Sequence, residues 1–215
     1  ILSLSIWVPI FAGVLVLCTG GDQNARLARW LALFGSIAAF LVTLPLYTHF
    51  NMMDGGFQFQ EGHRWITSFN INYHLGVDGL AVPLIILTSF TTVIVVIAGW
   101  EVIEKRVAQY MAAFLIMSGL MIGVFAALDA ILYYMFWEAM LIPMFLVIGI
   151  WGGPNRVYAT IKFFLYTFIG SLLMLVAFIY LYHQSNSFEL VDYYQLPLSF
   201  KAQILIFLAF FMAFA

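Results

Sequence analysis

The stretch 130–151 reads AILYYMFWEAMLIPMFLVIGIW and contains one charged residue, Glu138. A membrane-spanning helix needs about 20 mostly apolar residues, because each residue adds only about 1.5 Å of rise. This stretch is long and apolar enough to be such a helix. The Gly-Gly-Pro sequence at 152–154 follows it directly and is typical of a helix end. The stretch therefore predicts a membrane-spanning helix with a carboxylate inside it.

The composition extends this prediction to the whole chain. Of 215 residues, 65% are hydrophobic and only 8% are charged, whereas a soluble domain carries about 25% charged residues. So few charges cannot cover a soluble surface, and disorder would require low hydrophobicity. A net charge of -2 favours no nucleic acid partner. The single cysteine, Cys18, cannot supply the four thiolates of an iron–sulfur cluster.

Apolar runs recur along the chain and predict an all-α membrane protein, a polytopic transmembrane helix bundle of about seven spans. Membrane β-strands are disfavoured, because they are about 10 residues long and alternate in polarity. The last run is still apolar at Ala215 and would rise only about 21 Å, short of a core about 30 Å thick. We therefore expect an N-terminal fragment of a longer protein. The expected spans are 4–19, 30–50, 79–100, 110–128, 130–151, 157–182 and 202–215.

The chain divides into an N-terminal three-helix part, 1–109, and a second part, 110–215. The longest polar loop, 51–78, contains the alternating FQFQ sequence at 57–60, which predicts a small β-hairpin. Basic residues favour a cytoplasmic position for the loops that carry them. An N-terminus on the outside places six basic residues on or near the inside face and leaves Arg64 and Lys201 outside. The six are Arg26, Arg29, Lys105, Arg106, Arg156 and Lys162.

Glu138 is the candidate functional residue. It lies eight residues after Ala130 and thirteen before Trp151, which places it about 12 Å and 20 Å from the two helix ends. A carboxylate there costs at least ~2.5 kcal/mol to insert, and intramembrane carboxylates typically mark ion or proton paths. The alternative is a neutral packing residue that hydrogen-bonds to another helix. Pro143 also frees the Ala139 carbonyl, which could hold water beside the carboxylate.

Lys162 in the next predicted helix is the partner to consider for Glu138. It lies about 9 Å from the inside face, and Glu138 lies about 20 Å from that face. The gap of about 11 Å is too long for a salt bridge but suits a two-step relay through water. Alternatively, Lys162 extends its ammonium group to the interface. Asp78 and Asp129 each precede a predicted helix and are interpreted as N-caps or as functional carboxylates.

Three motifs resemble a known family. They are HLGVDGL at 74–80, WEAMLIPM at 137–144 and KFFLYT at 162–167. Together they resemble the antiporter-like M subunit, or chain 4, of respiratory NADH:quinone oxidoreductase (complex I). The resemblance runs through the chain and implies a little under half of a 14-span subunit, with 110–215 as the start of its proton-translocating repeat. It implies that Glu138 is a proton relay paired with a lysine just beyond Ala215. Lys162 is the candidate secondary relay from the spacing alone.

The resemblance also implies the setting of the chain. It implies an enzyme subunit that holds no redox centre, cofactor or metal, while other subunits hold NAD, FMN, iron–sulfur clusters and quinone. The implied partners are other complex I membrane subunits, especially sibling antiporter-like subunits, in a bacterial inner membrane with a periplasmic N-terminus. Two alternatives remain open from the residues: a subunit of an Mrp-type cation/proton antiporter, which shares the glutamate, and a structural membrane scaffold without a proton path.

Overall fold

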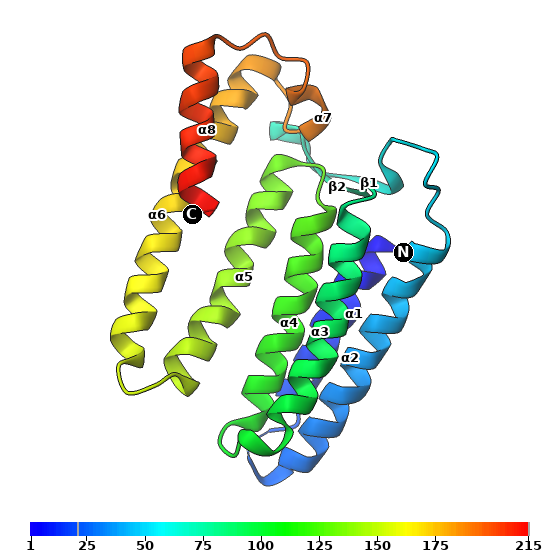
Figure 1. Cartoon of the computed structure of the whole chain (residues 1–215), viewed down its shortest axis with the longest axis vertical. Coiled ribbons are helices and arrows are strands. Elements are labelled where there is room, and N and C mark those ends of the chain that lie inside the picture. Colours follow the sequence, from blue (N-terminus) through cyan, green and yellow to red (C-terminus); the bar gives the residue numbers. More distant parts are fainter. Residues whose placement is uncertain (21, 215) are drawn as a thin grey trace.

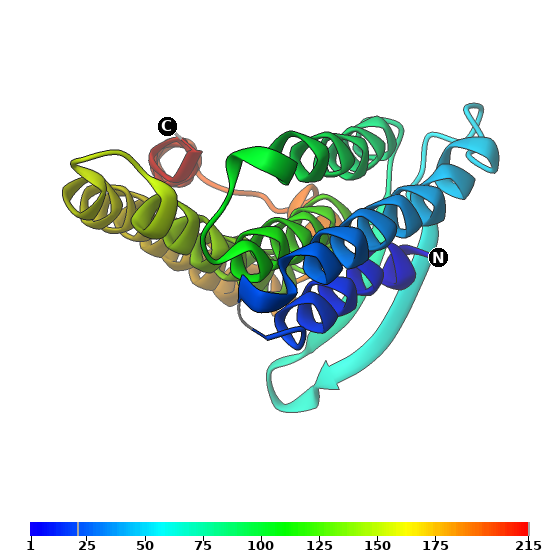
Figure 2. The ribbon, with the colours of Figure 1, turned by 90° about the horizontal axis from the view of Figure 1, so that it is seen from below.

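The computed structural model describes residues 1–20 and 22–214 and is mainly a bundle of long helices (Figure 1). A β-hairpin and the short helix α7 lie at one end of the bundle. Figure 2 shows α1 and α2 at one side of the molecule, α6 at the other, and α4 between them. The helices are α1 (Leu2–Leu17), α2 (Ala25–Thr48), α3 (Ala81–Val102), α4 (Val107–Ala126), α5 (Ala130–Trp151), α6 (Arg156–Ser185), α7 (Leu190–Tyr193) and α8 (Phe200–Phe214).

The predicted apolar runs each coincide with a helix, which confirms a helical, multi-pass membrane protein. Five helices, α2 to α6, are long and apolar enough to cross a membrane. The other two, α1 and α8, have 16 and 15 residues and fall short of the usual length of about 20. The α2 helix begins at Ala25, earlier than the apolar run, because its first turns carry interfacial arginines. One of these, Arg29, donates to the Ile103 carbonyl at the end of α3, 3.0 Å away.

The hairpin predicted in loop 51–78 is confirmed and is longer than its sequence signal. Strand β1 (Gln58–Ile66) pairs antiparallel with β2 (Ile71–Val77), and Gly62 lies opposite His74. A 3-10 turn and Asn70, with φ 56°, connect the strands, and asparagine tolerates this left-handed conformation better than most residues. Strand β2 buries Leu75 and Val77 against the helices, so it is the strand that positions polar groups over the bundle.

The α4 helix is at the centre of the bundle. It is 56% buried over its most apolar window, against 33% or less for the other long helices. Two clusters of buried hydrophobic side chains include residues of α4. The cluster near the hairpin contains Ile122 of α4 with Leu2 and Leu75, and the cluster near the opposite end contains Met111 of α4 with Val16. The remaining helices leave wide apolar faces, which lipid can cover because it is itself apolar.

Two glycines of α4 allow its neighbours to approach closely. A Cβ on Gly119 would lie 2.5 Å from the Ile6 carbonyl oxygen of α1, and one on Gly123 would lie 2.7 Å from the Phe136 ring of α5. The two glycines of the G-x-x-x-G motif therefore contact two different helices, Gly119 contacting α1 and Gly123 contacting α5. Small residues take this role in membrane bundles because they let backbones come together.

We expect Gly119→Ala to destabilise the contact between α1 and α4 by about 1–3 kcal/mol, because backbone must move to admit the methyl group. The amount of assembled protein in the membrane, followed by blue-native electrophoresis over a temperature series, measures the effect. Gly153→Ala is the matched control, since a Cβ there meets nothing within 4 Å. Equal thermal stability of the two variants would contradict the prediction.

Candidate functional site

Glu138 lies in α5 with a half-buried side chain. Its Oε1 atom is shielded from solvent and has no hydrogen-bond partner among the described residues. An ionised, buried oxygen without a partner is costly, because desolvation is not offset by a hydrogen bond. The state of this carboxylate therefore depends on whether a proton or a cation accompanies it.

Two polar residues that the sequence analysis missed link Glu138 to α6. The hydroxyl group of Tyr134 interacts with both the Glu138 carboxylate and the Ser171 hydroxyl group. Ser171 is fully buried in α6, and its hydroxyl group donates to the Phe168 carbonyl at 2.9 Å. A signal for Tyr134 was present in the sequence, since residues four apart share a helix face. No local pattern pointed to Ser171, because its place depends on how α6 packs.

Aromatic rings surround the segment that carries the carboxylate. Trp137 stacks on Tyr133 with ring centroids 6.0 Å apart, and meets Phe214 of α8 edge-on at 5.1 Å. Tyr133 in turn meets Phe178 of α6 edge-on at 6.2 Å. Helices α5, α6 and α8 thus converge on this segment through aromatic contacts, which hold ring geometry tightly.

Lys162 lies on the exposed surface of α6. Its Nζ atom is 5.9 Å from the centroid of the Tyr158 ring, one turn nearer to Arg156. Among the described residues, Lys162 and Glu138 form no ion pair within 4.0 Å. The Lys162 side chain thus points toward the start of α6. A lysine that extends its ammonium group to the membrane interface has this geometry.

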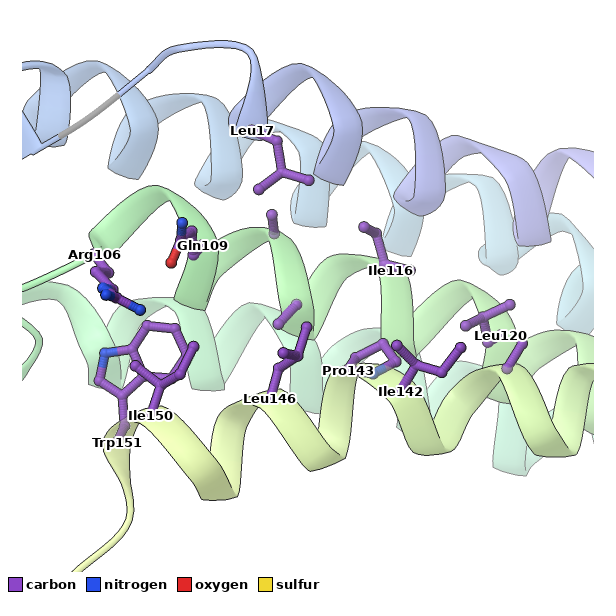
Figure 3. Close-up of a pocket in the computed structure, with 13 residues that line it drawn as sticks. Leu17, Arg106, Gln109, Ile116, Leu120, Ile142, Pro143, Leu146, Ile150 and Trp151 are labelled. Carbon is purple, nitrogen blue, oxygen red and sulfur yellow. The ribbon is translucent and has the colours of Figure 1, made fainter. Parts of the chain in front are cut away.

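Pro143 and Ala139 face α4 rather than the carboxylate side of α5. Both line a groove of about 610 Å³ between α4 and α5, and Glu138 does not (Figure 3). Successive helical residues are rotated by about 100°, so Ala139 points away from its neighbour Glu138. The proline and the carboxylate therefore belong to different faces of the same helix.

A second polar cluster lies at the hairpin end of the bundle. The His74 Nδ1 atom is 2.6 Å from a Glu189 carboxylate oxygen, and the Asn72 amide donates to the other oxygen at 3.3 Å. The backbone N–H of Asn72 donates to Asp129 at 3.0 Å. Backbone hydrogen bonds also join Leu128 to His74 and to Leu190, each at 2.9 Å. This cluster ties β2, the α4–α5 turn and the segment before α7 to one another.

Asp129 is the buried centre of that cluster, with no exposed surface. One carboxylate oxygen accepts from the N–H groups of Ile131 and Leu132, at 2.9 and 3.0 Å. Burial raises the pKa of Asp129, although its backbone hydrogen bonds oppose the shift, and the nearby Glu189 charge raises it further. The N-cap interpretation is confirmed for Asp129. For Asp78 it is wrong by position, because Leu80 is the N-cap residue of α3, although the exposed Asp78 carboxylate accepts from the N–H groups of Leu80 and Ala81.

Two family comparisons together cover nearly all of the chain. The family described as NADH-ubiquinone oxidoreductase chain 4, amino terminus, matches residues 4–126. The family described as NADH:quinone oxidoreductase/Mrp antiporter, TM, matches residues 127–215. The chain belongs to the chain 4, or subunit M, family of NADH:quinone oxidoreductase. Within this chain 4 family member, the first match covers α1 through α4, and the second begins at the α4–α5 turn.

Individual relatives agree with this membership. This chain is 44% identical to NADH-quinone oxidoreductase subunit M of Rhodobacter capsulatus and covers 44% of the length of that protein. It is 38% identical to subunit M of Rickettsia prowazekii, covering 45% of it, and 39% identical to chain 4 of Arabidopsis thaliana, covering 43%. All of this chain is matched in each case. The chain thus spans a little under half of the length of these relatives.

Solved structures share the fold. A chain of respiratory complex I from Thermus thermophilus with bound NADH matches with a TM-score of 0.86 and 29% identity. That match covers 100% of this chain and 43% of the other. A chain of the Mrp complex from Dietzia sp. matches with a TM-score of 0.84 and 16% identity, over 99% of this chain and 23% of the other. At that identity the Mrp match shows the fold alone.

Proposed function

We propose that this chain is part of a proton-translocating, antiporter-like membrane subunit of NADH:quinone oxidoreductase. In this role it couples NADH oxidation and quinone reduction to proton transfer through an intramembrane Glu/Lys relay. The observation that carries the proposal is the shielded Oε1 atom of Glu138 within α5. The Tyr134 hydroxyl group is close enough to Glu138 and to Ser171 for an electrostatic interaction. Membership of the chain 4 family supports the link to NADH oxidation.

The proton step follows from electrostatics at Glu138. An approaching cation stabilises the carboxylate and releases its proton, whereas withdrawal of the cation in a desolvated site favours proton uptake. We propose that this cation is a lysine of the full-length subunit, as the family resemblance implies. Among the described residues, Lys162 and Glu138 form no ion pair within 4.0 Å. The Tyr134 hydroxyl group, which interacts with both Glu138 and Ser171, provides a route toward α6.

The same proposal covers topology and setting. We assign α1 and α8 as the first and seventh spans, with 1–109 as an N-terminal three-helix part and 110–215 as the start of the translocating repeat. The α1–α2, α3–α4 and α5–α6 connections lie at the end of the bundle opposite the hairpin (Figure 1). Arg26 and Arg156 belong to the first turns of α2 and α6, and Lys105 lies between α3 and α4. This distribution supports an orientation with that end in the cytoplasm and the N-terminus in the periplasm. The bacterial inner membrane is proposed as the setting.

Redox chemistry is proposed to lie in other subunits. NAD, FMN, iron–sulfur clusters and quinone are bound there, and the sibling antiporter-like subunits pack alongside this one. The match to a chain of a respiratory complex I structure supports this assembly.

The experiment that separates complex I from an Mrp-type antiporter uses everted membrane vesicles of the source cells, with and without the full-length gene. We expect deletion to remove NADH-driven acidification of the vesicles and to leave succinate-driven, Na⁺-induced proton release intact. Re-expression should restore the first activity. Loss of the Na⁺-induced release, with NADH-driven acidification unchanged, would assign the chain to a cation antiporter instead.

Lys162 is proposed as a secondary relay, and its side chain provides a test. We expect Lys162→Met to lower NADH-driven proton translocation severalfold, but less than a change at Glu138, because Lys162 lies about 11 Å from that carboxylate along the membrane normal. Lys201→Met, at the start of α8, is the matched control and should retain native translocation. Native translocation in both variants would leave Lys162 with an interfacial role only.

A further inference from the structure

The groove between α4 and α5 has a polar end and a long apolar part (Figure 3). Arg106, Gln109 and Trp151 form the polar end, and the rest of the lining is aliphatic. Among the residues that the structure describes, no acidic side chain lines it. The aliphatic lining comes from Leu17 of α1, from Ala112, Ala113, Ile116 and Leu120 of α4, and from Ala139, Ile142, Pro143, Leu146 and Ile150 of α5.

The polar end gathers positive charge. Figure 3 shows the Arg106 side chain directed toward Trp151 at the groove end. The Trp151 indole donates to the Lys105 carbonyl at 3.1 Å, and Arg156 donates to the Ile150 carbonyl at 3.1 Å. The guanidinium group of Arg106 therefore lines this end of the groove, and that of Arg156 contacts the backbone of the lining residue Ile150. Glu101 and Glu104 precede them in the chain, and in the described part of the chain neither forms an ion pair with Arg106.

The length of the groove matches one leaflet of a bilayer. From Ala139 to Trp151 the α5 lining extends over twelve residue steps, which is about 18 Å of helix, against about 15 Å for half of a hydrocarbon core. A membrane-spanning helix would need both leaflets and about 30 Å. A groove that is apolar for one leaflet and cationic at the headgroup level fits a lipid better than a helix.

We propose that this groove binds an anionic phospholipid, with an acyl chain along the α4–α5 lining and the phosphate group at Arg106. Gln109 and the Trp151 ring lie beside Arg106 to complete the headgroup site. Arginine suits this task, because its planar guanidinium binds phosphate through two hydrogen bonds. The deep end of the groove reaches Ala139, next to Glu138, so a bound chain supports α5 on a face about 100° around the helix from the carboxylate. The proposal is independent of the proposed proton relay.

A cross-linking experiment on the full-length protein in its purified complex tests this site. A photoactivatable phenylalanine derivative replaces Leu146, and the complex is placed in vesicles of phosphatidylcholine with a minority of phosphatidylglycerol. We expect phosphatidylglycerol in the cross-linked lipid to exceed its mole fraction about fivefold, the selectivity that one arginine gives for anionic lipid. The matched control is Ile97 of α3. It is 56% exposed against 46% for Leu146 and lies equally far from its helix end.

Variants then identify the headgroup contact. Arg106→Gln should reduce the enrichment at Leu146 to the level at Ile97, whereas Arg26→Gln, a basic residue at the same end outside the groove, should leave it unchanged. Equal lipid composition at Leu146 and Ile97 in the unmodified complex would overturn the proposal without any variant. Cross-links from Leu146 to a neighbouring protein would overturn it too, and would make the groove a subunit contact.

Discussion

Replacing Glu138 by glutamine is expected to lower NADH-driven proton translocation by about 100-fold, the scale of losing a positioned proton donor and acceptor. Glutamine keeps the size of the side chain and its place on α5 but cannot hold or release a proton. Acidification of everted vesicles by NADH measures the effect, with the rate of NADH oxidation and the amount of assembled complex measured on the same membranes.

The control for Glu138→Gln is Glu101→Gln, which removes an exposed carboxylate near the end of α3. It should leave translocation at the native level. Tyr134→Phe removes the hydroxyl group that interacts with both Glu138 and Ser171, and we expect a partial loss. If the Glu138→Gln complex assembles, oxidises NADH and translocates protons at native rates, Glu138 is a packing residue and the relay proposal is wrong.

Replacing Asp129 by alanine is expected to destabilise the hairpin end of the bundle by about 3 kcal/mol. The loss of an N-cap costs about 1 kcal/mol, and a buried N–H left without an acceptor adds about 1–3 kcal/mol. Both apply, since Asp129 accepts from the start of α5 and from Asn72 of β2. Faster hydrogen exchange in β2, about 100-fold for that energy, is the measurement.

Asp78→Ala is the matched control for this change. The Asp78 carboxylate also accepts from N–H groups at the start of a helix, but it is exposed, so water replaces the lost acceptor and the cost is about 1 kcal/mol or less. Comparing the two variants therefore separates the stability lost with a buried hydrogen-bond acceptor from the stability lost at a helix start. Equal exchange rates in β2 for both would show that Asp129 acts only as a cap and does not hold the hairpin.

Local properties of the sequence predicted the helices well. The α5 helix runs from Ala130 to Trp151, as expected, because an N-cap aspartate precedes it and Gly152 ends it. The beginning of α2 at Ala25 was missed by five residues, since a helix continues into the interface beyond its apolar run. Helix α7 was not predicted, because four residues carry too little pattern.

The candidate site was predicted only in part. The position of Glu138 within its helix follows from counting residues along one segment. Its neighbour Ser171 lies on α6, and the pairing of His74 with Glu189 joins residues 115 positions apart. Hydropathy carries no information about such pairs, because each is decided by which helix faces meet.

The sequence by itself determined that the chain forms apolar helices of membrane length and that one of them contains a carboxylate. This follows from solvation, since about 20 apolar residues with internal backbone hydrogen bonds are stable in lipid wherever their neighbours lie. Only the tertiary structure decided that the Tyr134 face of α5 lies near Ser171 of α6, while Ala139 and Pro143 face α4. Neighbouring helical residues point about 100° apart, and close packing at Gly119 and Gly123 sets which face each helix presents.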